Sequence, residues 1–422
     1  MSRLIDRVRA SRALPVPADP LYGYMQQTYA KDGLESVLPT FQSYAQEGYQ
    51  GNGVVFSLIL ARISLGSECE FKFQDKTTKR IFGSPALSLL ENPWPSGTTG
   101  ELLARMIQDA DLAGNAFVRR VSADRLERLR PDWVDIASEE DPATGACEVI
   151  GYVYWRGGRL HNEPEVYLVG EVAHWSPIPD PLAEWRGMSW LTPVVREINS
   201  DAAMTVHKGK FFENAATPNL VIRYATKLAP EQVVTLRDRW QARFGGPDNG
   251  WKTAILDEGA DLTVVGNSFE QMSFTAVQAA GENRIASAAG VPGIVVGFKE
   301  GLSAATYSNY EQAMRRFADV TMRPLWRSAA AALAKLVDVP VGARLWYDVG
   351  GIAALRQGEK DRAETAQIYA AAAMNLINAG YVPDSVTAAL TSGDMTQLTH
   401  TGAIPTALYP EGRVPITGGK PA

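Results

Sequence analysis

Two patterns of apolar and polar positions alternate along residues 51–180. The spacing of three or four residues that is typical of one helix face first occurs at Val54, Leu58, Arg62 and Leu65. The alternation that is typical of strands occurs at residues 70–74, 116–121, 149–155 and 167–175. These patterns predict a compact unit of mixed helices and strands.

A second helix is predicted between the first two of these strands, because signals for its start and its end are both present. Thr98 or Thr99 can cap the N-terminus, with Glu101 in the first turn. Gly114 lies where a left-handed glycine commonly ends a helix. The strand at 116–121 would then follow the helix directly.

Helical spacing dominates the second half of the chain. Helices are predicted at residues 193–214, 230–244 and 269–290, from residue 303 with a kink at Pro324, and at 359–379. The small insert at 219–266 also contains a predicted strand at 219–224 and a predicted hairpin of 252–256 with 261–265. A further strand is predicted at 343–347, and an apolar loop bounded by glycines lies at 293–301.

Both ends of the chain lack a periodic pattern. Residues 1–50 are polar and are interrupted by Pro15, Pro17 and Pro20, which predicts an extended arm that orders only against a neighbour. The last residues, from about 396 to 422, are rich in Gly and Pro and predict a loose tail.

Composition and charge narrow the classes of function. A chain of 422 residues with 45% hydrophobic and 21% charged residues has an ordinary globular balance, and its length predicts two or three structural units. The 41 Lys and Arg residues against 47 Asp and Glu residues give a net charge of −6. This balance excludes a protein that grips nucleic acid over its whole surface, so a chain of this kind that meets DNA should let it pass.

The cysteines and the apolar runs argue against disulfides and membrane contact. The chain has two cysteines, Cys69 and Cys147, which are far apart and form no CxxC pattern, so a disulfide scaffold and a Cys-rich zinc site are disfavoured. No run of about 18 apolar residues predicts a membrane span, and no apolar segment follows the basic start of the chain. We expect a cytoplasmic product.

A search for catalytic chemistry yields one candidate residue. The chain has four histidines, none in a metal-ligand spacing, and no GxSxG motif. Residues 245–253 contain glycines and a lysine but have the wrong spacing for a phosphate loop and follow a helix instead of a strand. No metal and no cofactor is therefore predicted. His174 could be a catalytic base, and the simpler interpretation is a histidine satisfied by hydrogen bonds at a strand end.

Four stretches of the chain resemble, in the right order, the portal proteins of long-tailed bacteriophages. Residues 112–118 (LAGNAFV) are similar to the family's helix–GNA(F/Y)–strand junction. Residues 171–193 are similar to its strand that ends in His and its G-x-S-x-L lead into a long helix. Residues 210–218 resemble its FF-x-N-G-x-x-P helix end, with Ala215 where glycine is usual, and residues 289–309 resemble its GVP…G…S-x-S/T-x-x-N passage.

The resemblance implies an α+β portal fold with a mixed α/β wing, a helical stem, a small α/β clip, a long kinked spine helix and a C-terminal helical crown. The implied boundaries are an N-terminal arm at 1–50, the wing at 51–189, stem helix 1 at 190–216, the clip at 217–267, stem helix 2 at 268–290, the tunnel loop at 291–303, the spine helix and return to the wing at 304–354, the crown at 355–395 and the tail at 396–422.

The resemblance also implies a structural role rather than an enzymatic one. Portal proteins of this kind form a homo-dodecameric ring at one vertex of the virion capsid, after assembly in the host cytoplasm. Double-stranded DNA passes through the ring without sequence-specific binding. The implied protein partners are the terminase large subunit, a head–tail connector or adaptor, and the major capsid or scaffolding protein.

Two sets of site residues follow from the implied fold. The candidates for the DNA-facing tunnel loop are Val296, Gly297, Phe298, Lys299, Glu300, Gly301 and Leu302. The candidates for the clip surface that contacts terminase or connector are Arg237, Arg239, Arg243, Asp248 and Lys252. Two alternatives stay open, namely the portal of a gene transfer agent or domesticated prophage, and a cytoplasmic α/β hydrolase-like enzyme that uses His174.

Overall fold

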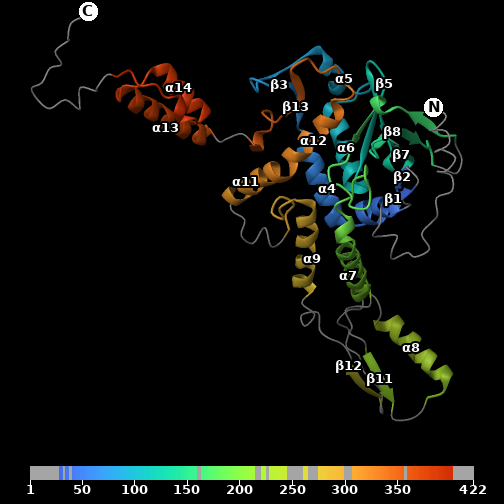
Figure 1. Ribbon diagram of the computed structural model, residues 1–422. Helices are drawn as coiled ribbons and strands as arrows, with labels where there is room; N and C mark the ends of the chain where they lie inside the picture. The colour runs from blue at the N-terminus through green and yellow to red at the C-terminus, as the bar shows by residue number, and fades with distance from the viewer. Residues whose placement is uncertain are drawn as a thin grey trace, which may run out of the picture. The chain divides into compact units, whose positions relative to one another are not determined.

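The chain forms two units, residues 1–355 and residues 356–422. The computed structural model describes residues 28–31, 34–37, 40–141, 143–158, 163–213, 220–224, 228–244, 260–264, 274–298, 307–355 and 359–402. Helices and small antiparallel sheets alternate along the first unit, and the described part of the second unit consists of helices (Figure 1). No described helix is long and apolar enough to cross a membrane.

Helices supply the largest part of the core of the first unit. Its longer helical elements are α4 (Gly53–Gly66), α6 (Thr99–Ala113), α7 (Val195–Glu213), α8 (Pro230–Phe244), α9 (Phe274–Ala289), α11 (Tyr307–Arg316), the π-helical segment η7 (Phe317–Met322) and α12 (Arg323–Leu333). α4 packs against α6, α9 and η7. The buried Trp326 of α12 closes this core by donating its indole N–H to the carbonyl of Gly66 at 3.0 Å.

Four antiparallel sheets are described. The first sheet contains, in spatial order, β1 (Thr28–Lys31), β2 (Leu34–Val37), β7 (Val134–Glu140), β8 (Cys147–Tyr154) and β9 (Glu165–Tyr167). The second sheet contains β10 (Val172–Trp175), β5 (Ala116–Ser122) and β6 (Arg125–Leu129), and the third contains β13 (Ala343–Asp348), β3 (Glu70–Asp75) and β4 (Ile81–Phe82). The fourth sheet pairs β11 (Leu220–Tyr224) with β12 (Ala260–Val264). Since β13 pairs with β3 in register Leu345 to Phe73, the sheet joins distant parts of the chain.

Short helical turns connect these elements. They are α3 (Thr40–Ser43), the π-helical η1 (Tyr44–Gln50), η2 (Pro85–Leu87), α5 (Ser88–Glu91), η3 (Pro131–Trp133), η4 (Val169–Glu171), η5 (Thr192–Val194) and η8 (Ala353–Leu355). The second unit contains α13 (Glu359–Asn378), α14 (Pro383–Ser392) and η9 (Met395–Gln397).

The helix and strand predictions for residues 53–121 are confirmed. α4 begins at Gly53 with the Asn52 side chain accepting hydrogen bonds from the N–H groups of Val54 and Val55. Thr98 caps α6 by accepting from the N–H of Glu101, and Gly114 ends the helix with φ of 71°. The strands β3 and β5 occupy the predicted segments.

The prediction of one strand over residues 167–175 is wrong, because a turn of 3-10 helix divides it. The Glu171 side chain accepts a hydrogen bond from the N–H of Leu168 at 2.8 Å and holds η4 in place. β9 before the turn pairs with β8, whereas β10 after it pairs with β5. Alternation alone could not show that the two halves belong to different sheets.

The predicted hairpin in the insert also has a different partner. β12 pairs with β11 along its whole length, from Leu220 opposite Val264 to Tyr224 opposite Ala260. The other half of the predicted hairpin, residues 252–256, lies outside the described residues. The strand itself is confirmed, but its described partner lies more than thirty residues away, before α8.

The described part of residues 1–50 departs from the extended arm that the sequence predicted. β2 pairs with β7, and the buried carboxylate of Glu35 accepts hydrogen bonds from the backbone N–H groups of Glu184, Trp185 and Arg186 at 2.7–3.2 Å. A carboxylate with this many donors is well satisfied without an ion pair. This part of the segment is therefore built into the first unit.

The predicted kink at Pro324 takes the form of a π-helical segment immediately before it. α11, η7 and α12 follow one another without a gap, and Pro324 lies in the first turn of α12. Because proline has no N–H and its ring crowds the carbonyl four residues earlier, the α-helical pattern is disturbed near Val320. The wider π turn of η7 spans that position.

Substitution of Gly114 by Ala is expected to destabilise the first unit by about 2–4 kcal/mol, because the new Cβ combines a positive φ with a steric clash. That Cβ would lie 2.3 Å from the carbonyl oxygen of Gly187. Gly342→Ala is the matched control, since Gly342 has φ of 79° but open space around it. Denaturant unfolding measures both, and equal losses would contradict the role of the close approach.

Candidate functional site: the end of α9, its anchor and the motif junction

The residues of the first two family-like stretches meet at one buried junction. Asn115 Nδ2 donates to the carbonyl oxygens of Ala113 at 2.8 Å and Gly187 at 3.0 Å, while its Oδ1 accepts from the N–H of Gly187 at 2.9 Å. The Ser189 hydroxyl donates to the carbonyl of Asp111. These bonds tie the turn between α6 and β5 to the segment that leads into α7.

His174 belongs to the same junction. Its Nε2 lies 2.9 Å from Asn115 Oδ1, an acceptor, so that Nε2 carries the proton, and its ring stacks on Phe117 with centroids 4.5 Å apart. Burial lowers the pKa of His174 to about 3, and the nearby positive charges of Arg186 and Lys335 act in the same direction. With an amide as its described partner instead of a carboxylate, His174 is a structural histidine that holds the junction.

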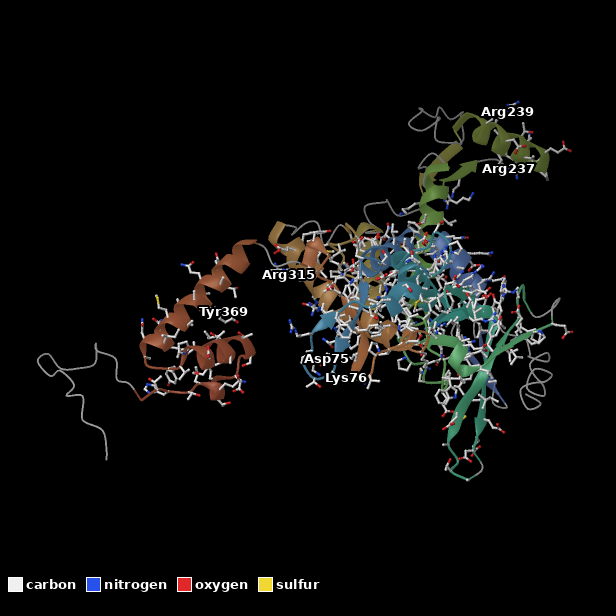
Figure 2. All side chains as sticks on the ribbon, turned by 90° about the horizontal axis from the view of Figure 1, so that it is seen from above. Asp75, Lys76, Arg237, Arg239, Arg315 and Tyr369 are labelled. Atoms are coloured by element: carbon white, nitrogen blue, oxygen red, sulfur yellow. The ribbon has the colours of Figure 1, made fainter. Side chains whose placement is uncertain are left out.

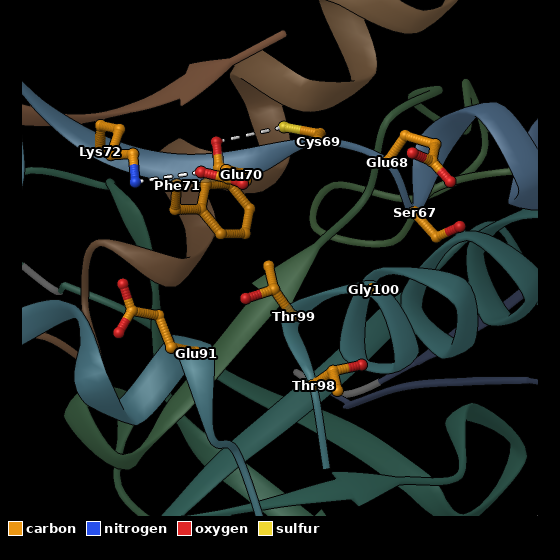
Figure 3. Close-up of a pocket in the computed structure, with 10 residues that line it drawn as sticks. All are labelled: Ser67, Glu68, Cys69, Glu70, Phe71, Lys72, Glu91, Thr98, Thr99 and Gly100. Carbon is orange, nitrogen blue, oxygen red and sulfur yellow. Dashed lines mark hydrogen bonds and ion pairs between the residues drawn. The ribbon is translucent and has the colours of Figure 1, made fainter. Parts of the chain in front are cut away.

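A polar pocket of about 420 Å³ lies between the start of β3 and the start of α6 (Figure 3). Glu70 and Lys72 form an ion pair of 3.0 Å within it, and Thr99 donates its hydroxyl to the carbonyl of Leu90. Burial raises the pKa of the Cys69 thiol to about 12, so this sulfur stays protonated and unreactive at neutral pH. The residues that line the pocket form no nucleophile and base arrangement.

The tunnel-loop candidates follow the end of α9. Gly290 ends the helix with φ of 67°, and the N–H of Val291 donates to the carbonyl of Ala286 at 3.0 Å. In the turn that follows, the N–H of Phe298 donates to the carbonyl of Gly293 at 2.9 Å. Of the predicted loop residues, Val296 and Phe298 pack partly against the main core and Gly297 is exposed, whereas residues 299–302 lie outside the described residues.

Arg62 anchors the end of α9 to the core. Its guanidinium binds Asp111 through two bonds of 2.8 Å, and its remaining Nη1 donates to the carbonyl of Ala289 at 2.5 Å. Both side chains are almost fully buried. Desolvation raises the pKa of the Asp111 carboxyl, and the adjacent Arg62 opposes that effect. One buried group therefore links α4, α6 and the last carbonyl of α9.

A second anchor comes from the π-helical segment. The Thr321 hydroxyl donates to the carbonyl of Gly290 at 2.7 Å. A Cβ added to Gly290 would lie 2.7 Å from that hydroxyl, so the contact requires glycine. Two successive carbonyls, of Ala289 and Gly290, are thus held by Arg62 and Thr321 directly before the loop begins.

Polar side chains join α7 to α9. The buried Asp201 of α7 accepts a hydrogen bond from Gln278 of α9 at 3.4 Å, and Lys208 of α7 donates to the same Gln278 at 3.0 Å. Nearer the end of α9, Arg284 pairs with Glu197 at 2.8 Å. The contact between the two helices is therefore partly polar.

The clip candidates lie on and after α8. Arg237 and Arg239 are exposed, and Arg237 pairs with Asp238 at 3.0 Å (Figure 2). The structure does not describe the side chain of Arg243, and Asp248 and Lys252 lie outside the described residues. The described arginines are thus accessible, and the exposed ion pair of Arg237 with Asp238 contributes little stability.

A family model for the phage portal protein matches residues 56–378 of the chain. The chain belongs to the phage portal protein family. A probable portal protein of Streptomyces phage phiC31 is 28% identical over 109 residues, which is 26% of this chain and 24% of that protein. An uncharacterised protein of Rickettsia bellii is 21% identical over 285 residues, 66% of this chain and 72% of that protein.

Solved structures show the same fold for this portal protein. A chain in the neck of a native gene transfer agent particle, computed with C12 symmetry, has a TM-score of 0.57 and is 24% identical to this protein. The match covers 79% of this chain and 88% of the neck chain. An HK97-family phage portal protein from Corynebacterium diphtheriae has a TM-score of 0.51 and is 12% identical to this protein. The match covers 74% of this chain and 98% of that portal protein. Portal proteins are structural, which agrees with the role of His174.

Sequence reasoning missed the two anchors of α9. Arg62 was placed correctly on a helix face, and its position among Val54, Leu58 and Leu65 was the available signal that a charge would be buried there. Its partner Asp111 and the carbonyl of Ala289 are 49 and 227 residues away, beyond any local pattern. Nothing in the local sequence marked Thr321.

Replacing Arg62 by Met is expected to destabilise the first unit by about 3–5 kcal/mol, since it leaves the Asp111 carboxylate buried without a partner. Arg284→Met is the matched control, because this arginine of α9 pairs at the surface and should cost less than about 1 kcal/mol. Chemical unfolding of both variants measures the difference. A loss for Arg62→Met no larger than the control's would disprove the anchor.

His174 is expected to make stability depend on pH. Its pKa is lowered from 6.5 to about 3 in the folded chain, so the unfolded chain binds one more proton throughout this interval. The contribution is complete above pH 6.5 and is lost as the pH falls towards 3, by up to about 1.4 kcal/mol per pH unit. His174→Gln keeps a donor for Asn115 but does not titrate. Unfolding curves of both proteins at a series of pH values should diverge below pH 6.5, and parallel curves would refute the buried neutral histidine.

Proposed function

We propose that this portal protein forms a homo-dodecameric ring at one vertex of a capsid, through which double-stranded DNA enters during packaging and leaves during ejection. The terminase large subunit docks on the ring during packaging, and a head–tail connector replaces it afterwards. The ring also contacts the major capsid or scaffolding protein. Its place is the virion, after assembly in the host cytoplasm.

The observation that carries this proposal is the likeness to the neck chain of the gene transfer agent particle, together with the family match over residues 56–378. The likeness extends over 79% of this chain and 88% of the other, so it concerns the whole architecture and not one local motif. The C12 symmetry of that particle's neck is the basis for the proposed number of subunits.

We assign the domains of a portal to the described elements. The wing contains α4, α6 and the sheets of β1–β10, the stem consists of α7 and α9, and the clip contains β11, α8 and β12. The tunnel loop begins at Val291, the spine is formed by α11, η7 and α12, and the crown by α13 and α14. The contacts between α7 and α9 and the pairing of β11 with β12 support this assignment.

The tunnel loop is proposed to face DNA with few cations. Its predicted residues include one cation and one anion, Lys299 and Glu300, and the chain as a whole carries a net charge of −6. Each strong contact with a phosphate would become a barrier to sliding, so a conduit benefits from weak contacts. The anchors at Ala289 and Gly290 would hold the base of the loop in place while DNA moves past it.

The exposed arginines of α8 are proposed to contact the terminase or the connector. Arg237 and Arg239 are exposed on α8, with Arg237 paired to Asp238, and would offer guanidinium hydrogen-bond donors to an acidic side chain of the partner. The role of Arg243, Asp248 and Lys252 in the same surface rests on the family resemblance.

A gene transfer agent is the specific alternative setting. The neck chain of the gene transfer agent is 24% identical to this protein with a TM-score of 0.57, against 12% and 0.51 for the phage portal protein of the HK97 family. The same ring and the same channel are proposed for either setting.

Native mass spectrometry combined with electron microscopy of the purified chain tests the proposed assembly. We expect a hollow ring of about twelve copies of the 45.9 kDa chain, that is about 550 kDa. A protein that stays monomeric or forms a small compact oligomer at high concentration would rule the ring out.

A further inference from the structure

The hairpin of β3 and β4 concentrates positive charge in a chain that is acidic overall. Residues 72–80 contain four cations and one acid, whereas the whole chain has a net charge of −6. Residues 76–83 are all exposed, and Figure 2 labels Asp75 and Lys76 at the start of the turn. Three of the cations, Lys76, Lys79 and Arg80, form no ion pair among the described residues.

The turn of this hairpin is fixed by its own hydrogen bonds. Asp75 accepts from the N–H groups of Thr77 at 2.8 Å and Thr78 at 2.7 Å, and these bonds lower the pKa of its carboxyl. The N–H of Lys79 donates to the carbonyl of Asp75 at 3.0 Å, and the Gln74 side chain donates to the carbonyl of Lys79 at 2.9 Å. The cations therefore project from a preorganised backbone, which lowers the entropic cost of binding.

Lys79 has a left-handed backbone conformation, with φ of 62°. A residue with a Cβ is strained there, whereas glycine adopts this conformation freely. The Lys79 ammonium donates to the carbonyl of Lys76 at 2.6 Å, which holds its charge at the tip of the turn. A lysine at a position that suits glycine indicates that the side chain is used there.

β4 adds an apolar edge to this charged turn. It lies at the end of its sheet, with Ile81 46% and Phe82 40% exposed. The carbonyl of Arg80 accepts from the N–H of Asp75 at 3.0 Å. Because antiparallel strands alternate in the direction of their peptide groups, the N–H and carbonyl of Ile81 point away from β3. Such an edge can accept a further strand.

The sheet face beside Ile81 carries another cation. Ile81 lies opposite Gln74, and Gln74 lies opposite Arg344 of β13, so the three side chains share one face. Arg344 donates to the Gln74 side-chain oxygen at 2.9 and 2.6 Å and lies 3.8 Å above the ring of Trp346. Ile81 therefore has one cation across the sheet, at Arg344, and another before it in the strand, at Arg80.

From these contacts we propose that the β3–β4 hairpin binds an extended acidic segment of another protein along the edge of β4. The segment pairs with the outward peptide groups of Ile81. Its carboxylates meet Lys76, Lys79 and Arg80, and an apolar side chain between them covers Ile81 and Phe82. This surface is separate from the arginines of α8 and does not depend on the number of copies in the proposed ring.

Charge and shape favour an acidic protein segment over other occupants. Cations on an edge strand repel basic strands that would otherwise pair there, so they select an acidic one. Nucleic acid would also meet the cations, but the aliphatic Ile81 offers no ring on which a base can stack. The ring of Phe82 already packs on Phe73, with centroids 5.9 Å apart. The same hairpin of a second copy would bring like charges together.

Fluorescence anisotropy of labelled probes with the full chain tests this proposal. The probe is a short peptide of alternating glutamate and valine, and its comparators are a peptide of alternating lysine and valine and a short DNA duplex. The charge-reversal variant is Lys76→Glu/Lys79→Glu/Arg80→Glu. Its matched control makes the same change in net charge at three exposed cations that are dispersed over β6, α11 and α12, namely Arg125→Glu/Arg316→Glu/Arg327→Glu.

We expect the glutamate–valine peptide to bind the unchanged chain and the lysine–valine peptide not to bind it. Charge reversal at the hairpin should weaken binding about tenfold, since three exposed ionic contacts combine to roughly that factor, and the dispersed control should change it little. Ile81→Ser should weaken binding about threefold through lost apolar burial. Val341→Ser is the control for that change, because Val341 is also exposed in the first unit.

Equal losses in the two charge-reversal variants would overturn the proposal, because binding would then follow net charge alone. Binding of the duplex without binding of the peptide would assign the surface to nucleic acid instead. A failure of every probe to bind would reject the proposal, and so would a change of oligomeric state in the hairpin variant by native mass. The proposed ring is judged separately, from the native mass of the unchanged chain, and stands or falls independently of these results.

Discussion

The buried ion pair of Arg62 with Asp111 is the interaction on which the arrangement of the first unit depends. Two charged groups in a core are costly unless each finds its full set of partners. Here the guanidinium binds the carboxylate through two bonds and donates from its third nitrogen, Nη1, to the carbonyl of Ala289. Because an uncompensated buried charge would be severely destabilising, this group favours the packing in which α4, α6 and the end of α9 meet.

The junction beside this pair explains why the family-like stretches have their particular residues. Gly114 and Gly187 approach so closely that a Cβ on either would lie 2.3 Å from the carbonyl oxygen of the other. Asn115 then bonds the peptide at Gly187, and His174 is held against Asn115 and Phe117. The glycines, the amide and the imidazole of these stretches therefore serve to join α6, β5 and β10 to the segment before α7.

This organisation suits a structural protein of the portal family. The described residues of the first unit place their buried polar groups at junctions between elements and not around a substrate pocket. The anchored base of the loop, the partly polar contact of α7 with α9 and the exposed arginines of α8 are features that a channel subunit can use.

The sequence by itself determined the longer helices, several of the strands, the family and some of the positions that need special residues. The spacing of apolar residues located α4, α6, α9, α13 and β3, and the signals at Thr98 and Gly114 located both ends of α6, because these features depend on neighbours within a few residues. Tertiary structure alone decided which strands pair, that Glu35 joins the first unit, and that Arg62 and Thr321 hold the end of α9. Those outcomes depend on groups up to 227 residues apart, whose meeting is set by packing and by the satisfaction of buried polar groups, and local periodicity carries no information about either.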